Sequence, residues 1–253
     1  MFALDVTDRV ARLTLDHPPA NAIGPAWREA LERQLDGLAT RDDWTVLHLR
    51  SSVKLFCAGL DLAHAAAVLA APGGPERLRD ESRRVQAVLA RLAALDRPSV
   101  AEIGGAALGG GLELALACDL RIAALDAKLG LPEVSLGVVP AFGGTQRLSR
   151  VCGAATAARL VLGAEIVAGE AARDLGLVQW AVPSDELPTA AAGLVRRLAG
   201  FSRPALMWAK RCLAAAGDPR QDGFVLELDA GVDLGRRDEV RQAIAAFAAP
   251  RRS

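Results

Sequence analysis

The chain has 253 residues, and its 30 basic and 30 acidic side chains give a formal net charge of zero. This length fits one large domain, or one domain with a small appendage, and an apolar fraction of 51% can form a sizeable core. The charge balance lacks the basic footprint of a nucleic-acid-binding protein. The four cysteines are widely separated and include no C-x-x-C pair, which argues against disulfide and zinc frameworks.

The N-terminal residues, MFALDVTDRV, carry three charged side chains where a signal peptide would need an apolar run. No stretch of the sequence reaches the roughly 18 uncharged apolar residues that indicate a membrane span. We therefore expect a reduced, soluble, cytoplasmic protein.

Strand patterns alternate with helical patterns from the N-terminus, which predicts an α/β architecture. A helix is expected from Pro25, because apolar residues recur at helical spacing as far as Leu38 and proline is well tolerated at the first helical position. Strand signals stop after about residue 183, and helices are expected from there to the C-terminus. We therefore expect a core over residues 1–189 and a helical region over residues 190–253. The expected strands are 10–15, 45–49, 99–103 and 120–123, and the expected C-terminal helices are 186–199, 203–215 and 221–248.

Three consecutive glycines, Gly109 to Gly111, open a predicted helix over residues 112–118. Glycine lets another molecule approach the backbone closely. The free N–H groups of a first helical turn favour an anion or a developing oxyanion. Tight packing of the helix against a strand is the alternative explanation of the triplet.

Two glutamates stand in glycine-rich, otherwise apolar surroundings. Glu113 has apolar neighbours on every side of its predicted helix, and a buried carboxylate is costly unless it is paired or protonated. Glu133 follows Pro132 near the start of a short predicted helix. A structural salt bridge or a favourable interaction with the helix dipole would also explain either residue. Together, the two carboxyls suit general acid–base catalysis, which needs one group to give a proton and another to take one.

Other catalytic motifs are absent from the sequence: there is no Walker A sequence, G-x-G-x-x-G, H-E-x-x-H or G-x-S-x-G. The three histidines, His17, His48 and His64, show no ligand spacing, and His48 is expected to be a strand residue. We expect no metal site.

Several ordered motifs together resemble the enoyl-CoA hydratase/isomerase (crotonase) superfamily over nearly the whole chain. They are PANA (19–22), FCAGLDL (56–62), ALGGGLELA (107–115), PE (132–133) with GGTQRL (143–148), GEAARDLGLV (169–178) and a final helix over 238–247. The resemblance implies a spiral of β-β-α turns with two roughly perpendicular sheets, followed by a helical region that builds trimers. Hexamers made of two trimers are common in that family.

The resemblance also implies the roles of individual residues. The backbone N–H groups of Leu60 and Gly110 would form an oxyanion hole for a thioester carbonyl oxygen. Glu113 and Glu133 would contact the attacking water, with Glu133 delivering a proton to the α-carbon. No metal or redox cofactor is needed, because coenzyme A is part of the substrate. Residues matched to the binding of coenzyme A and substrate are Ala20, Ala22, Lys54, Ala58, Asp61 and Leu62.

The expected activity is the hydration of a 2-enoyl-CoA to a 3-hydroxyacyl-CoA. A Δ3,Δ2-enoyl-CoA isomerase, in which Glu133 alone moves a proton, is the second candidate. Leu60 stands where many hydratases have alanine and some isomerases have leucine. Thioester hydrolases, C–C-cleaving enzymes and non-catalytic CoA- or RNA-binding homologues are more remote. Ala63 replaces a second lysine of some members, and Phe142 is expected to narrow the acyl pocket.

The C-terminal region is too short to bury its helical faces as an independent domain. We therefore expect its apolar side chains to pack on the core and on neighbouring chains, in a homotrimer or a hexamer. The apolar side chains that we expect to contribute are Leu206, Trp208, Leu213, Phe224, Leu226, Leu228, Ile244 and Phe247.

Overall fold

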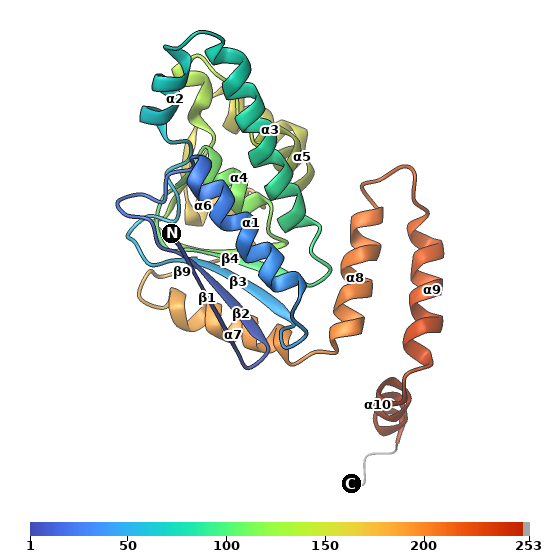
Figure 1. The fold of residues 1–253 in the computed structure, drawn as a ribbon. Helices are drawn as coiled ribbons and strands as arrows, with labels where there is room; N and C mark the ends of the chain where they lie inside the picture. Colours follow the sequence, from blue (N-terminus) through green and yellow to red (C-terminus); the bar gives the residue numbers. More distant parts are fainter. Residues whose placement is uncertain (250–253) are drawn as a thin grey trace. The chain divides into compact units, whose positions relative to one another are not determined.

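The computed structural model describes residues 1–249 and divides the chain into two compact units, one over Met1–Ala199 and the other beginning at Gly200 (Figure 1). The first unit extends beyond the boundary at residue 189 that the sequence suggested. The reason is the helix α7, Leu187–Ala199, whose buried face packs against four strands, β2 (Val10–Leu15), β3 (Val46–Ser51), β4 (Ser99–Ile103) and β6 (Leu120–Ala124).

The first unit is a mixed α/β structure with two sheets. The larger sheet has the order β1-β2-β3-β4-β6-β9, in which only the β1–β2 pair is antiparallel. The smaller sheet has the order β5-β7-β8. The strands of the larger sheet are β1 (Phe2–Thr7), β2 (Val10–Leu15), β3 (Val46–Ser51), β4 (Ser99–Ile103), β6 (Leu120–Ala124) and β9 (Trp180–Val182). Those of the smaller sheet are β5 (Ala107–Leu108), β7 (Lys128–Gly130) and β8 (Ile166–Ala168).

The helices of this unit confirm the expected alternation. α1 begins with Pro25 at its first helical position and buries the apolar stripe from Trp27 to Leu38. The buried stripe is the one that the helical spacing indicated. The other helices are α2 (Leu62–Leu69), α3 (Gly74–Ala93), α4 (Gly110–Leu116), the 3₁₀ helix η1 (Pro132–Leu136), α5 (Gly144–Leu162) and α6 (Gly169–Asp174).

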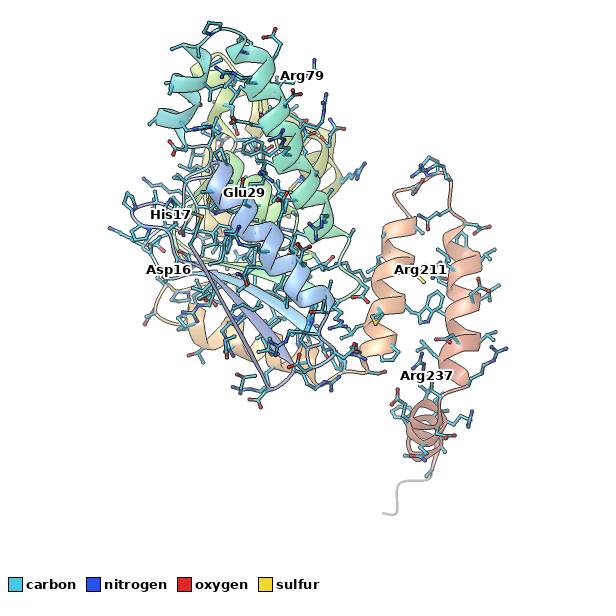
Figure 2. The ribbon with its side chains drawn as sticks, viewed as in Figure 1. Asp16, His17, Glu29, Arg79, Arg211 and Arg237 are labelled. Atoms are coloured by element: carbon cyan, nitrogen blue, oxygen red, sulfur yellow. The ribbon has the colours of Figure 1, made fainter. Side chains whose placement is uncertain are left out.

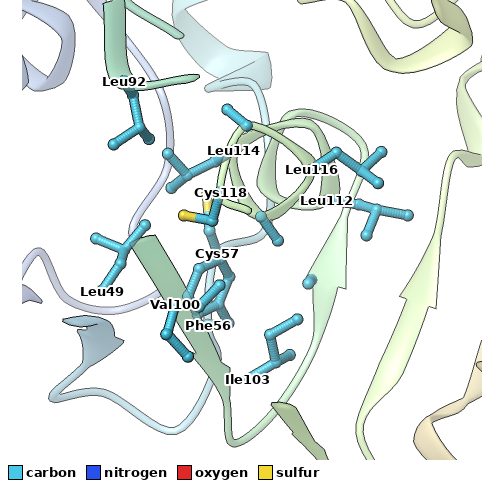
Figure 3. Packing of buried hydrophobic residues seen from close by; sticks show 14 of the residues in the cluster. Leu49, Phe56, Cys57, Leu92, Val100, Ile103, Leu112, Leu114, Leu116 and Cys118 are labelled. Carbon is cyan, nitrogen blue, oxygen red and sulfur yellow. The ribbon is translucent and has the colours of Figure 1, made fainter. Parts of the chain in front are cut away.

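The short helix α4 is embedded in the hydrophobic core. Its side chains Leu112, Leu114 and Leu116 are at most 5% exposed, and they share one buried cluster with Phe56 and Leu49 (Figure 3). Burying such a side chain contributes ~1.5–3 kcal/mol. The core therefore holds α4 in place, together with any functional group on it.

His48 lies in β3, as expected, and is buried beside Glu102 of β4. The distance between His48 Nε2 and Glu102 Oε2 is 2.7 Å. Buried ionisable groups are tolerated in proteins when they are paired in this way. The sheet position and the paired environment both support a structural role for His48.

The second unit consists of the helices α8 (Arg203–Ala215), α9 (Gly223–Gly235) and α10 (Asp238–Ala248). Trp208 Nε1 donates a hydrogen bond to Asp233 Oδ2 at 2.9 Å, which ties α8 to α9, and Arg237 pairs with the same carboxylate at 3.2 Å. Figure 2 labels Arg211, whose guanidinium lies over the Trp208 ring, and Arg237. The single helix expected over residues 221–248 is two helices, because Arg237 has an extended backbone and begins a new helix.

Large apolar side chains remain exposed on this unit. Leu213 is 78% exposed, Phe224 is 82% exposed and Phe247 is 91% exposed. None of the helices within residues 1–249 is both long enough and apolar enough to cross a membrane.

Candidate active site

Two loops that lie far apart in the sequence run side by side at one end of β2 and β3. Ala58 N donates to Ala20 O at 3.0 Å, and Ile23 N donates to Gly59 O at 2.7 Å. The motifs PANA and FCAGLDL, which the family resemblance assigned to one binding site, are therefore neighbours in space.

The side chain of Asn21 locks these loops together, and the sequence analysis assigned it no role. Asn21 is fully buried, and its Oδ1 accepts a hydrogen bond from His17 N at 2.8 Å. Its Nδ2 donates to Ser51 Oγ at 2.8 Å and to Phe56 O at 2.9 Å. In the sequence, Asn21 is a single amide residue inside the PANA motif. Only the folded structure shows which groups its side chain binds.

The segment around Leu60 lies against the start of α4. A Cβ built on Gly59 would lie 3.0 Å from Gly110 N, which shows how closely the two backbones approach. Leu108 N also donates a hydrogen bond to Cys57 O at 3.1 Å. Among the described residues, the N–H groups of Leu60 and Gly110 donate no hydrogen bond. Gly110 is the first residue of α4, so its N–H carries the partial positive charge of a helix N-terminus. The two donors that the sequence predicted are therefore close together and free.

Glycine is required for a different structural reason at each position of the triplet. Gly109 has φ 52° and ψ −124°, a conformation that other residues avoid, and a Cβ there would lie 2.9 Å from Glu133 Oε1. A Cβ at Gly110 would lie 2.9 Å from the ring of Phe142, and one at Gly111 would lie 2.0 Å from Cys57 O. Close packing within the protein therefore explains each glycine, and the approach of a bound oxyanion to this backbone stays a prediction.

Glu113 lies in the first turn of α4 and is 1% exposed. Its Oε1 accepts hydrogen bonds from Phe142 N at 2.7 Å and from Gly144 N at 2.6 Å. Within residues 1–249 it forms no salt bridge, so the structural alternative of an ion pair is not observed. The loop before α5 therefore solvates this carboxylate with two backbone N–H groups.

Burial has the largest influence on the Glu113 carboxyl and raises its pKa to about 7. The N–H of Gly144 opposes this rise, and the nearby charge of Glu133 adds to it. The N–H of Phe142 and the cation of Arg147 also lower the pKa of Glu113. The group can therefore change its protonation state close to neutral pH.

Glu133 lies on η1 and is half-buried, and burial raises the pKa of its carboxyl as well. Its Oε2 is inaccessible to solvent and has no hydrogen-bond partner among the described residues. The negative charge of Glu133 adds to the raised pKa of Glu113, so ionisation of one carboxyl disfavours ionisation of the other. The structure thus leaves one oxygen of Glu133 without a partner among the described residues.

Arg147 on α5 is a further site residue to which the sequence analysis gave no role. Its Nη1 donates to Phe142 O at 2.8 Å, which holds the loop whose N–H groups bind Glu113. Burial lowers the pKa of Arg147, and the Glu113 carboxylate opposes that decrease. Arg147 appeared in the motif GGTQRL, but only the folded loop shows what it contacts.

The residues expected to bind coenzyme A occupy the same loops. Lys54 and Ala58 are exposed, and Leu62 is 60% exposed at the start of α2. The Asp61 carboxylate accepts a hydrogen bond from His64 N at 3.0 Å and caps α2. A helix-capping role therefore accounts for Asp61, and contact of these residues with coenzyme A stays a prediction.

A pocket of about 90 Å³ opens beside Leu60 and Phe142. The start of α1, together with α2 and α3, completes its walls. Phe142 is buried and lines the pocket next to Gly110, where the sequence analysis expected it to narrow the space for an acyl chain. Among residues 1–249, no group of three or more His, Cys, Asp and Glu side chains could hold a metal ion.

The family model described as Enoyl-CoA hydratase/isomerase matches residues 5–253 of this chain. The chain belongs to the enoyl-CoA hydratase/isomerase family, within the crotonase superfamily. It is 36% identical over 242 residues to the 2,3-dehydroadipyl-CoA hydratase of Escherichia coli, covering 94% of this chain and 92% of the relative. It is also 43% identical over 177 residues to a probable enoyl-CoA hydratase of Bacillus subtilis, covering 70% of this chain and 67% of the relative.

The fold agrees with this family assignment. A crystal structure of an enoyl-CoA hydratase from Bacillus anthracis has a TM-score of 0.89 and 30% identity, covering 97% of this chain and 95% of that one. A second from Geobacillus kaustophilus has a TM-score of 0.91 and 28% identity, covering 97% of this chain and 92% of that one.

The raised pKa of Glu113 predicts a pH-dependent stability. A carboxyl whose pKa rises from 4.5 to about 7 on folding keeps its proton longer in the folded chain, so its contribution to stability is full below about pH 4.5 and decreases up to about pH 7. Glu113→Gln cannot titrate but still offers an oxygen to the two N–H groups. Compared with this variant, the wild type should lose at most about 3 kcal/mol of unfolding free energy across that range.

Chemical denaturation at a series of pH values measures this difference. Arg147→Gln removes a cation that lowers the pKa of Glu113, so the decrease should continue to higher pH in that variant, whereas Arg147→Lys should restore part of the effect. A difference between wild type and Glu113→Gln that stays constant from pH 4.5 to 8 would contradict the raised pKa.

Proposed function

We propose that this protein adds water across the 2,3 double bond of a 2-enoyl-CoA and forms a 3-hydroxyacyl-CoA. The observation that carries this proposal is the meeting of two groups of atoms at one site. The first group is two carboxyls with raised pKa values, the buried Glu113 and the half-buried Glu133. The second group is the backbone N–H groups of Leu60 and Gly110, which donate no hydrogen bond among the described residues. Hydratase names among the relatives support the same reaction.

The N–H groups of Leu60 and Gly110 would bind the thioester carbonyl oxygen. As a nucleophile attacks C3, negative charge moves onto that oxygen and forms an enolate. Donors fixed in advance around such an oxygen stabilise the transition state by ~3 kcal/mol each. The position of Gly110 at a helix N-terminus adds to this stabilisation.

The two carboxyls would handle the protons of the added water. Glu113 accepts two N–H hydrogen bonds, which favour its carboxylate form, so it is the group assigned to remove a proton from water. Glu133, whose Oε2 has no hydrogen-bond partner among the described residues, would hold a proton and deliver it to C2. The π bond between C2 and C3, one O–H bond of water and the O–H bond of Glu133 break, and a C3–O bond, a C2–H bond and an O–H bond on Glu113 form. Proton exchange with solvent then restores the starting state.

The second candidate is a Δ3,Δ2-enoyl-CoA isomerase. That reaction needs one group to move a proton between two carbons, which Glu133 alone could do. It leaves no role for Glu113, although the fold holds this carboxyl in a costly buried position between two N–H donors. A buried Glu113 carboxyl that two backbone N–H groups hold in place favours hydration, because only hydration uses this group.

Glu133→Gln should lower the turnover number for hydration by ~10²–10⁴-fold, because the amide keeps the shape of the side chain but cannot exchange a proton. Stopped assays that follow loss of the conjugated thioester would measure the turnover, and calorimetry with a saturated acyl-CoA should show nearly unchanged binding. Retention of more than about a tenth of the wild-type turnover would exclude Glu133 as the proton donor.

Glu113→Gln separates the two candidate reactions. Hydration should fall by ~10²-fold or more, since water loses the base that activates it, whereas isomerisation of a 3-enoyl-CoA should change little. Both substrates should be assayed on one preparation, so that a folding defect appears as a loss of both activities. Hydration that persists in this variant would refute the mechanism, even though the family assignment would stand.

We also propose that the chain assembles as a homotrimer or a hexamer. The exposed apolar side chains of the C-terminal unit, Leu213, Phe224, Leu228, Ile244 and Phe247, provide an apolar surface that a neighbouring chain could bury. Light scattering at micromolar concentration should give the mass of three or six chains, and truncation before Phe201 should abolish that assembly. A stable and active monomer would contradict this proposal.

A further inference from the structure

We propose that the pocket beside the catalytic residues accepts a short acyl chain that ends in a carboxylate, and that Arg84 binds this terminal carboxylate. The inference rests on the proposed function, because it assumes that the pocket receives the acyl group of a CoA thioester. It adds a substrate class and a specificity-determining residue.

The part of the pocket nearest the catalytic groups is apolar. Leu60, which would supply an oxyanion N–H, and Phe142, whose own N–H binds Glu113, both line it, and Ile23 lies beside them. Aliphatic carbons next to the reacting double bond would therefore contact apolar side chains, as in most ligand pockets.

The rest of the lining combines polar side chains with Leu78 and Val85, and its acidic groups already have partners. Glu29, labelled on α1 in Figure 2, pairs with Arg28 at 3.0 Å, and Arg28 also pairs with Glu32 at 2.6 Å. Glu81 of α3 contacts Nε2 of His64 of α2 at 2.8 Å. These contacts satisfy Arg28 and both acidic groups of the lining.

Arg84 on α3 differs from these groups. Its side chain lines the pocket, and among the described residues its guanidinium has no hydrogen bond or ion pair. Arg84 and the preceding residue, Arg83, are both exposed, but Arg83 pairs with Asp80 at 3.2 Å and does not line the pocket. Arg84 is thus the one cation of this pocket lining without a carboxylate partner in the part of the chain that the structure describes.

The guanidinium of Arg84, unpaired among the described residues, would discriminate between acyl chains that end in different groups. A long alkyl chain would have to displace water from Arg84, Ser82 and the His64–Glu81 pair and would offer them nothing in return. A terminal carboxylate would instead form a charge-assisted and potentially bidentate pair with the guanidinium. A cationic end would lack a free partner, because Glu29 and Glu81 are already paired.

The test measures the binding of two saturated thioesters that cannot react, hexanoyl-CoA and hexanedioyl-CoA, which differ only in the terminal carboxylate. Wild-type protein should bind hexanedioyl-CoA more tightly, and Arg84→Gln should reduce this preference about tenfold. Arg84→Lys should retain part of it. Arg83→Gln is the matched control, since it removes a neighbouring arginine of the same helix that lies outside the pocket, and it should leave the preference unchanged. Added salt should weaken the preference in the wild type.

Equal binding of the two thioesters by the wild type would overturn the proposal, as would equal effects of Arg84→Gln and Arg83→Gln. Turnover of crotonyl-CoA, whose acyl chain ends in a methyl group and has no terminal carboxylate, tests the proposed function separately. If crotonyl-CoA is hydrated but no carboxylate preference exists, only the role of Arg84 fails. If the preference exists but crotonyl-CoA and the unsaturated analogue of hexanedioyl-CoA are not hydrated, only the proposed reaction fails.

Discussion

The Glu113 carboxylate, held by the N–H groups of Phe142 and Gly144, is the contact on which the rest of the site depends. A carboxylate that is 1% exposed would be strongly destabilising without such donors. The donors come from a loop that Arg147 fixes through Phe142 O. A Cβ at residue 144 would lie 2.9 Å from Glu113 Oε1, so glycine is needed there for the loop to approach.

The other parts of the site follow from the position of α4. This helix is too short to be stable alone, and burial of its leucines among the core side chains keeps it in place. Its N-terminus brings Gly110 N–H next to the Leu60 segment, and the turn at Gly109 leaves room for the Glu133 carboxyl. One embedded helix thereby positions both the proposed oxyanion donors and the carboxyl pair.

The sequence predicted four strands of the larger sheet and several helices, because their signals are local, but it did not indicate β1, β9 or the strands of the smaller sheet. The apolar stripe of α1 and the bounds of β2 were correct, and the buried position of Glu113 followed from its apolar neighbours. Family motifs indicated the carboxyl pair, and the fold places both residues close enough for their charges to interact.

What the sequence did not predict depends on contacts between distant segments. Asn21 binds loops that are 30 or more residues away, and the guanidinium of Arg147 acts through a carbonyl oxygen of a turn. The extent of the first unit depends on the packing of α7 against the sheet, which no periodicity reveals. The break between α9 and α10 is an exception, because Gly235 at the end of α9 is a local signal that was not interpreted as a helix end.

The most direct test of the central claim is to incubate the protein with a 2-enoyl-CoA in water labelled with heavy oxygen and to identify the products by mass spectrometry. Addition of water by the carboxyl pair predicts an intact 3-hydroxyacyl thioester that carries one heavy oxygen at C3. Free coenzyme A with a labelled acid would indicate thioester hydrolysis instead. Unlabelled thioester with a moved double bond would indicate isomerisation, and either of these results would contradict the account.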